Sequence, residues 1–187
     1  MFQEDIEKSL EALKNGGVIL YPTDTIWGIG CDATNEEAIE RIFGIKRRNE
    51  AQSMLTLVDG LEMLAKYVDN IPEEAIQLIN DAVRPLSVIY PAAKNLAANL
   101  IAADGSIGIR IVQDEFCQRL IKALGKPVVS TSANISGQPA PGVFNDITDD
   151  VKAAVDYIVR WRQDEQKPAT ASSIIKLNVD GSYTVLR

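Results

Sequence analysis

The stretch Val18–Gly30, VILYPTDTIWGIG, decides how the fold of this chain is read. Its first four residues, 18–21, are apolar and favour β structure, so they predict a buried strand. Pro22 ends that strand, because proline has no N–H to donate to a neighbouring strand. Residues 23–30 then bring hydroxyl groups, a carboxylate, an indole and glycines to the carboxyl end of the strand, where ligand sites lie in α/β sheets. A plain strand-to-helix loop with capping side chains would use the same residues, and the stretch alone slightly favours that simpler interpretation.

Helical and strand patterns alternate along most of the chain on both sides of this stretch. Apolar spacing and capping residues predict helices over 2–13, from 34 or 35 to 45, from 59 or 60 onward, 72–83 and 115–124. Runs of β-forming residues predict strands over 18–21, 54–58, 86–90, 107–112, 127–130, 156–160, 173–177 and 182–186. The pair Asp180-Gly181 predicts a hairpin before the last strand. This order predicts one α/β domain over residues 1–187, with a mixed sheet.

Composition limits the classes of protein that fit. The chain has 187 residues, 46% of them hydrophobic, which is enough for one sizeable core. Its net charge of −7 argues against bulk electrostatic binding to nucleic acid, although a local basic pocket is compatible with it. Cys31 and Cys117 form no CxxC pattern, which predicts reduced thiols in a cytoplasmic protein rather than disulfides or a zinc site. The acidic first ten residues are unlike a secretory signal, and no apolar run could span a bilayer, so we expect no membrane association.

The chain contains no histidine. This excludes Ser-His-Asp and Cys-His nucleophilic catalysis and the HExxH metalloproteases. An enzyme with this sequence must work with lysine, arginine, carboxylates, hydroxyls and backbone dipoles. Such groups suit reactions that depend on positioning and charge stabilisation, above all phosphoryl or nucleotidyl transfer.

Two basic features could serve that chemistry. Lys46, Arg47 and Arg48 end a predicted helix, where the helix dipole favours cations. Three consecutive cations point in different directions and cannot all serve one dipole, so we expect Lys46 and Arg48 to bind phosphate and Arg47 to point outward. Arg110 lies within the predicted strand 107–112, and a buried arginine needs an anionic partner. A structural salt bridge and a bound anion explain Arg110 equally well.

The stretch 130–137, STSANISG, places hydroxyls and an amide directly after a short predicted strand. Small residues there would let a ligand approach the backbone, and a capped serine-rich turn is the simpler alternative. The chain has neither the GxxxxGK[ST] nor the GxGxxG pattern, so a nucleotide would have to bind without the two commonest phosphate motifs.

Three motifs in this order carry a family resemblance: YPTDTIWGIGCDA at 21–33, IKRR at 45–48 and STSANISGQP at 130–139. Together they resemble the YrdC-type L-threonylcarbamoyladenylate synthase family, and the likeness runs over 16–187 in the short form without an added carboxyl-terminal domain. The resemblance implies a twisted mixed sheet flanked by helices around a deep, locally positive cavity. It implies that L-threonine, bicarbonate and ATP give threonylcarbamoyl-AMP and pyrophosphate, for tRNA modification by a separate threonylcarbamoyl transferase complex. Weak binding to double-stranded RNA is a further implication.

The same resemblance assigns roles to individual residues. It places Lys46 and Arg48 in catalysis, holding the ATP phosphates. The residues it assigns to L-threonine are Thr25, with Thr23 as the alternative, Arg110, Ser132 and Ser172. Those it assigns to ATP, besides the catalytic pair, are Gln52, Asn134 and Arg187. Mg²⁺ would come with the triphosphate, and no metal is assigned to protein side chains.

Two other interpretations are compatible with the sequence. A non-catalytic RNA-binding module would use 160–162, Arg-Trp-Arg, together with a basic pocket, but the net charge counts against it. A nucleotide-binding relative without turnover would fit the departures from the family pattern, which include 49–54 and Leu57, where some relatives have a histidine.

Overall fold

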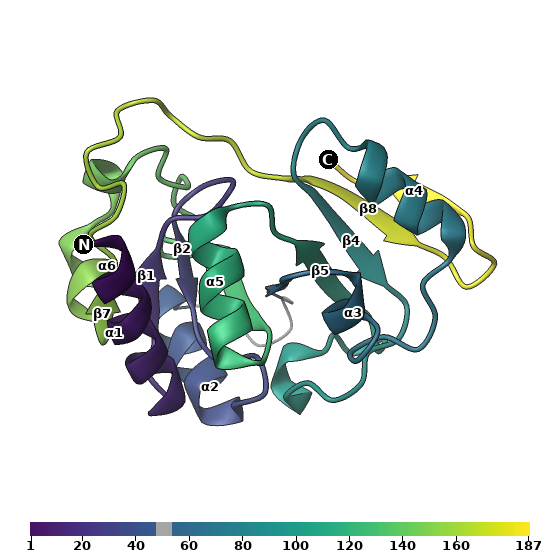
Figure 1. Cartoon of the computed structure of the whole chain (residues 1–187), viewed down its shortest axis with the longest axis horizontal. Coiled ribbons are helices and arrows are strands. Elements are labelled where there is room, and N and C mark those ends of the chain that lie inside the picture. The colour runs from purple at the N-terminus through teal and green to yellow at the C-terminus, as the bar shows by residue number, and fades with distance from the viewer. Residues whose placement is uncertain (48–53) are drawn as a thin grey trace.

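One mixed β-sheet runs through the molecule. The computed structural model describes residues 1–47 and 54–187. Its strands are β1 (Ile19–Tyr21), β2 (Gly28–Gly30), β3 (Leu55–Val58), β4 (Leu86–Tyr90), β5 (Ile107–Ile111), β6 (Val128–Ser132), β7 (Tyr157–Ile158), β8 (Ser173–Leu177) and β9 (Tyr183–Val185). Among the described residues the strands form a nine-stranded sheet in the order β7-β1-β2-β6-β3-β5-β4-β8-β9 (Figure 1). The pairs β1–β7, β3–β5 and β4–β8 are parallel and the others antiparallel, so the predicted mixed sheet is confirmed.

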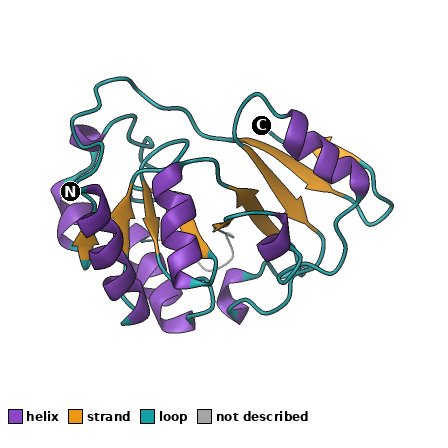
Figure 2. Ribbon diagram, in the orientation of Figure 1, coloured by secondary structure: helices purple, strands orange, loops and turns teal. Residues whose placement is uncertain are grey.

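Helices lie outside the strand layer (Figure 2). They are α1 (Phe2–Lys14), α2 (Glu36–Lys46), α3 (Leu61–Leu64), α4 (Glu73–Asp81), α5 (Glu115–Leu124) and α6 (Asp149–Ala153), with short 3-10 turns at Ala98–Leu100 and Phe144–Asp146. Side chains cap the starts of α2 and α5, and a glycine ends α5. Asn35 Oδ1 accepts a hydrogen bond from the Ala38 N–H at the start of α2, and Asp114 Oδ1 accepts one from the Cys117 N–H at the start of α5. Gly125, with φ 72°, ends α5 in the left-handed conformation that glycine adopts without strain.

The main difference from the sequence prediction is β2. Gly28–Gly30 pairs antiparallel with β1, so residues 22–27 form a loop between two strands and not a strand-to-helix connection. The two glycines let neighbouring groups come close. A Cβ on Gly30 would lie 2.3 Å from the Val129 carbonyl oxygen and 2.6 Å from the Tyr21 ring. Such contacts are sterically forbidden, so glycine at position 30 serves strand packing rather than loop freedom.

Smaller differences concern element boundaries. β6 extends to Ser132, two residues further into the polar stretch than predicted. The strand predicted over 156–160 is paired only at Tyr157–Ile158, and the helix predicted over 72–83 covers Glu73–Asp81 with Pro72 at its N-cap. α6 was not predicted from the sequence. It is only five residues long and has no strong apolar period.

A long loop joins the two halves of the sheet, running along the top of the view in Figures 1 and 2 from the β7 side to β8. Its central part, residues 161–171, is called the crossing segment below. Asp5 of α1 anchors its beginning, because this fully buried carboxylate accepts hydrogen bonds from the Tyr157 hydroxyl (2.5 Å), Arg160 Nε (3.3 Å) and the Trp161 N–H (2.9 Å). At its far end the Ala169 N–H donates to the Gly142 carbonyl (3.1 Å). The beginning of the crossing segment is therefore tied to α1, and Ala169 is tied to the loop that follows β6.

Candidate functional site

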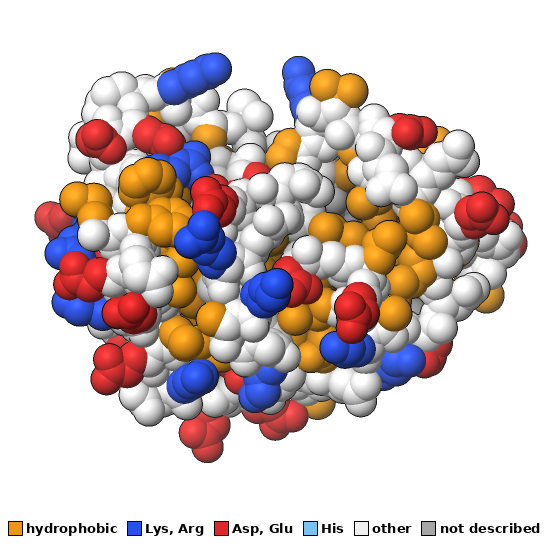
Figure 3. All heavy atoms as spheres, viewed as in Figure 1, with side chains coloured by type: hydrophobic (Ala, Val, Ile, Leu, Met, Phe, Trp, Pro, Cys, Tyr) orange, Lys and Arg blue, Asp and Glu red, His pale blue; other side chains and the backbone are white. Residues whose placement is uncertain are grey.

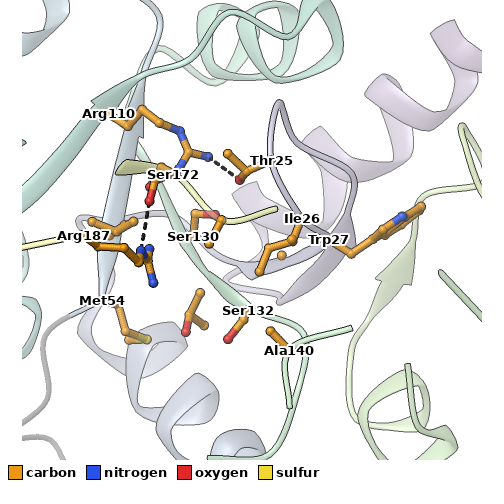
Figure 4. A pocket seen from close by; sticks show the side chains of 14 residues that line it. Thr25, Ile26, Trp27, Met54, Arg110, Ser130, Ser132, Ala140, Ser172 and Arg187 are labelled. Carbon is orange, nitrogen blue, oxygen red and sulfur yellow. Dashed lines mark hydrogen bonds between the residues drawn. The ribbon is translucent and has the colours of Figure 1, made fainter. Parts of the chain in front are cut away.

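A cavity of about 280 Å³, called the central cavity below, opens between the loop after β1 and the ends of β6 and β8. Five of the residues to which the sequence assigns ligand contacts line it: Thr25, Arg110, Ser132, Ser172 and Arg187. Figure 4 shows these side chains, which come from well-separated parts of the chain, directed toward one space. The strand order places β2 beside β6, so that the loop before Gly28 lies next to Ser132.

The loop between β1 and β2 is shaped by Thr23. Its hydroxyl accepts a hydrogen bond from the Thr25 N–H (3.0 Å), donates to the Ile26 carbonyl (2.9 Å) and lies 3.0 Å from the Thr25 hydroxyl. Thr23 is buried within this turn. Of the two threonines, Thr25 lines the central cavity and Thr23 does not, so Thr25 is the one placed to touch a ligand there.

Arg110 and Asp24 form a buried ion pair at the wall of the cavity. Arg110 Nη2 lies 2.9 Å from Asp24 Oδ1 and 3.2 Å from the Thr25 hydroxyl, and the two charged side chains are only 2% and 8% exposed. Asp24 Oδ2 also accepts a hydrogen bond from the Gln113 N–H (3.2 Å). The anionic partner that a buried arginine requires is therefore within the protein. The sequence left this salt bridge open and offered Asp24 only as a capping residue of the loop, not as the partner of Arg110.

The ion pair does not use all the hydrogen-bonding capacity of its members. Within the described part of the chain, Arg110 Nε and Asp24 Oδ1 are buried and have no hydrogen bond. The contact between Nη2 and Oδ1 is thus close but poorly aligned for a hydrogen bond. Since a guanidinium has five N–H donors, Arg110 can pair with Asp24 and still donate to a ligand in the central cavity.

Lys46, the last residue of α2, is 2% exposed and reaches the loop after β6. Its ammonium donates to the carbonyls of Ser132 (2.6 Å) and Asn134 (2.8 Å), with Asn134 Oδ1 at 3.5 Å. In return the Ser136 N–H donates to the Lys46 carbonyl (2.9 Å). The end of α2 and residues 132–136 are therefore held together, with a buried positive charge directly behind Ser132.

Arg47 and Arg48 are the other two residues of the basic triplet. Arg47 is in the left-handed conformation, with φ 49°, and its exposed side chain lies 3.8 Å from Asp150. It points outward, as the sequence predicts. Arg48 and Gln52 lie outside the described residues.

Asn134 does not line the central cavity. Its amide nitrogen donates to the carbonyls of Ile135 (3.1 Å) and Gln138 (2.7 Å), which closes the polar turn after β6. Ser130 and Thr131 of β6 line the cavity, and the sequence had given them no role. Their signal in the sequence was the dense run of hydroxyls in STSANISG.

Ser172 and Arg187 meet at the side of the cavity formed by β8. The Ser172 hydroxyl lies 2.8 Å from the hydroxyl of Ser87, and its carbonyl accepts a hydrogen bond from Arg187 Nε (3.0 Å; Figure 4). The Ile174 N–H donates to the Arg187 carbonyl (2.9 Å). Backbone pairing beyond β9 thus fixes residue 187 against β8, and its guanidinium borders the cavity.

A second hollow of about 620 Å³, the outer cavity, lies on the other side of the crossing segment. Asp24, Arg84 and Arg162 border it together with residues 165–171. Thr25 and Ala171 line both cavities, so the two cavities adjoin at these residues.

The two cysteines are both free and buried. Burial, with a contribution from the Asp114 and Asp24 carboxylates, raises the pKa of the Cys117 thiol, which donates to the Pro22 carbonyl (3.4 Å). Burial also raises the pKa of Cys31. Neither thiol is available as a nucleophilic thiolate near neutral pH.

Residues 1–47 and 54–187 contain no group of three or more His, Cys, Asp or Glu side chains that could hold a metal ion. None of the helices in this part of the chain is long and apolar enough to cross a membrane.

Comparison with known proteins identifies the family to which the chain belongs. The Sua5/YciO/YrdC family model, described as telomere recombination, matches residues 11–187. Two proteins named threonylcarbamoyl-AMP synthase are similar in sequence. The one from Pseudoalteromonas translucida is 37% identical over 139 residues, which are 73% of this chain and 74% of that protein, and the one from Vibrio cholerae is 33% identical over 140 residues, with the same coverage.

Solved structures agree with these matches. The structure of Escherichia coli YciO superimposes with a TM-score of 0.84 at 26% identity, covering 99% of this chain and 89% of that one. Pyrococcus abyssi Sua5 in complex with L-threonine superimposes with a TM-score of 0.85 at 25% identity, over 97% of this chain. The match covers 53% of that Sua5 chain, so this chain spans about half its length. Sequence and structure together show that the chain belongs to the Sua5/YciO/YrdC family.

Proposed function

We propose that this protein is an L-threonylcarbamoyladenylate synthase, a nucleotidyltransferase that forms threonylcarbamoyl-AMP and pyrophosphate from L-threonine, bicarbonate and ATP. The names of the two bacterial relatives and the L-threonine in the Sua5 complex support this reaction. The observation in this chain that carries it is the buried Arg110, with donors to spare, beside the Thr25 and Ser132 hydroxyls in one cavity.

L-threonine has three polar groups, and the central cavity offers a partner for each. The α-carboxylate suits the Arg110 guanidinium, because charge-assisted hydrogen bonds to carboxylates are the strong ones. The hydroxyl suits Thr25 and Ser132, which can each donate or accept. The amine must be uncharged and open on one side to react with bicarbonate, and we assign Ser172, which also lines the cavity, to this group.

The nucleotidyl step then needs no covalent enzyme intermediate. The uncharged amine nitrogen of threonine forms a bond to the carbon of bicarbonate. The carbon–hydroxyl bond of bicarbonate breaks, and the hydroxide leaves as water with a proton from the amine, giving an N-carboxylate. An oxygen of that carboxylate attacks the α-phosphorus of ATP, and the bond to the β-phosphate oxygen breaks to release pyrophosphate. Negative charge rises on the phosphorus oxygens during attack, and preorganised cations stabilise it. We assign this role to Lys46 and Arg48, with Gln52, Asn134 and Arg187 binding the rest of the nucleotide and Mg²⁺ arriving on the triphosphate.

The product is a mixed anhydride that a further enzyme must consume. We propose that a tRNA threonylcarbamoyl transferase complex takes it, which puts the protein in the cytoplasm with its tRNA. Direct RNA binding by residues 160–162 is disfavoured, because Arg160 is paired with Glu4 and Asp5, and Arg162 with Asp114 and Glu165. The face in Figure 3 carries interspersed acidic and basic side chains rather than one basic patch.

The test of this proposal is pyrophosphate release measured with each reactant omitted in turn. Release should require ATP, L-threonine and bicarbonate together, and it should stop when Mg²⁺ is chelated. Titrations of ATP and of RNA at physiological salt accompany the assay. Binding of ATP with no release under any condition would identify a nucleotide-binding protein without turnover, and salt-sensitive RNA binding alone would identify an RNA-binding module.

The choice of amino acid is a second consequence of this pocket. Threonine should be preferred over serine by only about 1 kcal/mol, since one buried methyl group separates them. Valine should be rejected more strongly, because the Thr25 and Ser132 hydroxyls would lose a hydrogen-bonding partner in a buried site. The ratio of kcat/KM values in a competition assay measures both. Equal turnover of valine and threonine would contradict the assigned hydroxyl contacts.

Arg187→Ala should weaken ATP binding several-fold while leaving the melting temperature nearly unchanged. The guanidinium borders the cavity and makes one hydrogen bond to the Ser172 carbonyl, whereas the backbone pairing with Ile174 does not depend on the side chain. Calorimetric titration with ATP measures the effect. Lys176→Ala on β8 is the control, because Lys176 is partly exposed, does not line the cavity and is paired with Asp104 (3.2 Å). An ATP affinity that is unchanged in Arg187→Ala would remove this residue from the nucleotide site.

A further inference from the structure

Arg162 does not line the central cavity, but it joins three parts of the chain, two of which do. The residue has φ 68° and a side chain that is 25% exposed. Its Nη1 donates to the Thr23 carbonyl (2.9 Å) and lies 3.2 Å from Asp114 Oδ2, while its Nε donates to Glu165 Oε1 (2.6 Å). One guanidinium thus ties the crossing segment to the loop after β1 and to the N-cap of α5.

The Thr23 carbonyl is one peptide bond away from Asp24, which pairs with Arg110, and two residues from Thr25. The Thr23 hydroxyl braces the turn internally, but it does not fix where the turn lies relative to β5. Contacts from outside set that position. Arg110 of β5 pairs with Asp24 and donates to the Thr25 hydroxyl, and two further contacts come from the Gln113 N–H on Asp24 and the Arg162 guanidinium on the Thr23 carbonyl. The second is charge-assisted and is therefore the stronger of the two.

We propose that Arg162 is a positioning residue for the amino-acid end of the site: it holds the loop after β1 so that Thr25 and Asp24 meet Arg110. This inference rests on the proposed function for its kinetic consequence, but not for its structural one. Lys46 and Asn134, which we assign to the nucleotide, are held together by a hydrogen bond that does not involve Arg162, so loss of Arg162 should disturb L-threonine binding and spare the nucleotide.

Arg160 supplies a matched control. It lies two residues away and also pairs with two carboxylates, Glu4 (2.5 Å) and Asp5 (3.3 Å). Both carboxylates belong to α1, and Arg160 makes no contact with the loop after β1. If ion pairs in this segment act only by general stabilisation, Arg160→Ala and Arg162→Ala should have the same effect on the site.

The experiment compares Arg162→Ala, Arg162→Lys and Arg160→Ala in steady-state kinetics. In Arg162→Ala the KM for L-threonine should rise about ten-fold or more, in line with the loss of one charge-assisted hydrogen bond. The kcat and the KM for ATP should change less than about two-fold. Arg162→Lys keeps the charge but cannot reach all three acceptors, so it should restore part of the threonine affinity. Equal rises in both KM values, or the same rise in Arg160→Ala, would overturn the proposal.

Hydrogen exchange of the peptide spanning residues 22–28 gives an answer that does not depend on the reaction. Exchange should be faster in Arg162→Ala than in the wild type, unchanged in Arg160→Ala and intermediate in Arg162→Lys. If the wild type shows no threonine-dependent turnover, the proposed function fails while this arm still tests the positioning role. Unaltered exchange in both Arg162 variants would overturn it, and Arg162→Lys alone decides the matter if the alanine variant does not fold.

Discussion

Lys46→Ala is expected to lower turnover by a few orders of magnitude. Removal of a preorganised cation or donor from a transition state of this kind costs about 2–4 kcal/mol. In this chain the ammonium also holds Ser132 and Asn134 in place through their carbonyls, so its loss displaces a wall of the central cavity as well as a charge. Pyrophosphate release under saturating substrates measures the effect.

Lys46→Ala should also destabilise the fold. Measuring that loss of stability separates the structural role of Lys46 from its role in turnover. The partly buried carbonyls of Ser132 and Asn134 would lose this donor, and a buried group left unsatisfied costs about 1–3 kcal/mol. The Ser132 carbonyl would keep the hydrogen bond from the Asn134 N–H (2.9 Å), so the cost falls mainly on the Asn134 carbonyl. Urea unfolding of Lys46→Ala measures this cost. Arg47→Ala is the matched control, since Arg47 is exposed and its ion pair with Asp150 is worth at most about 1 kcal/mol. A larger loss of turnover in Arg47→Ala than in Lys46→Ala would show that the basic triplet was assigned in the wrong order.

Asp24→Ala should be among the most destabilising single substitutions in the site. It would leave the Arg110 guanidinium buried without a counter-charge, which costs about 3–5 kcal/mol in comparable buried pairs. Arg110→Ala should likewise destabilise the fold by isolating Asp24, and it should abolish measurable L-threonine binding. Chemical denaturation gives the first quantity and calorimetric titration with L-threonine the second.

The double variant Asp24→Asn/Arg110→Met distinguishes stability from function. With both charges removed no buried ion is left unpaired, so this variant should be more stable than either single alanine variant. It should nevertheless bind no L-threonine, because the cation for the α-carboxylate is gone. A double variant that is no more stable than Asp24→Ala would mean that the pair is not coupled as the 2.9 Å contact indicates.

The sequence predicted most of the elements because their signals are local. The strand at 18–21, the end of α5 at Gly125 and the hairpin before β9 depend on residues within a few positions of one another. β2 could not be predicted in the same way. Gly-Ile-Gly has little β propensity, and the strand exists because glycine lets Val129 and the Tyr21 ring approach, which is a long-range condition.

In the candidate site, too, local features could be predicted from the sequence and long-range contacts could not. Residue type and position pointed to Arg110 and to the stretches 22–30 and 130–137, and the family resemblance named Thr25 and Ser132 within them. Their convergence depends on the order β2-β6-β3-β5, which no local pattern contains. The partner of Arg110 was unpredictable for the same reason, since Asp24 is 86 positions away in the chain. The contact of Arg162 with the Thr23 carbonyl has no sequence signature, because a backbone oxygen is the same at every residue.

The measurement that tests this account most directly is identification of the product by mass spectrometry after incubation with ATP, L-threonine, Mg²⁺ and ¹³C-bicarbonate. The account predicts threonylcarbamoyl-AMP with the label in its carbamoyl carbon, formed in equal amount with pyrophosphate and absent when L-threonine is left out. Consumption of ATP without a labelled adenylate, or with release of inorganic phosphate in place of pyrophosphate, would contradict it.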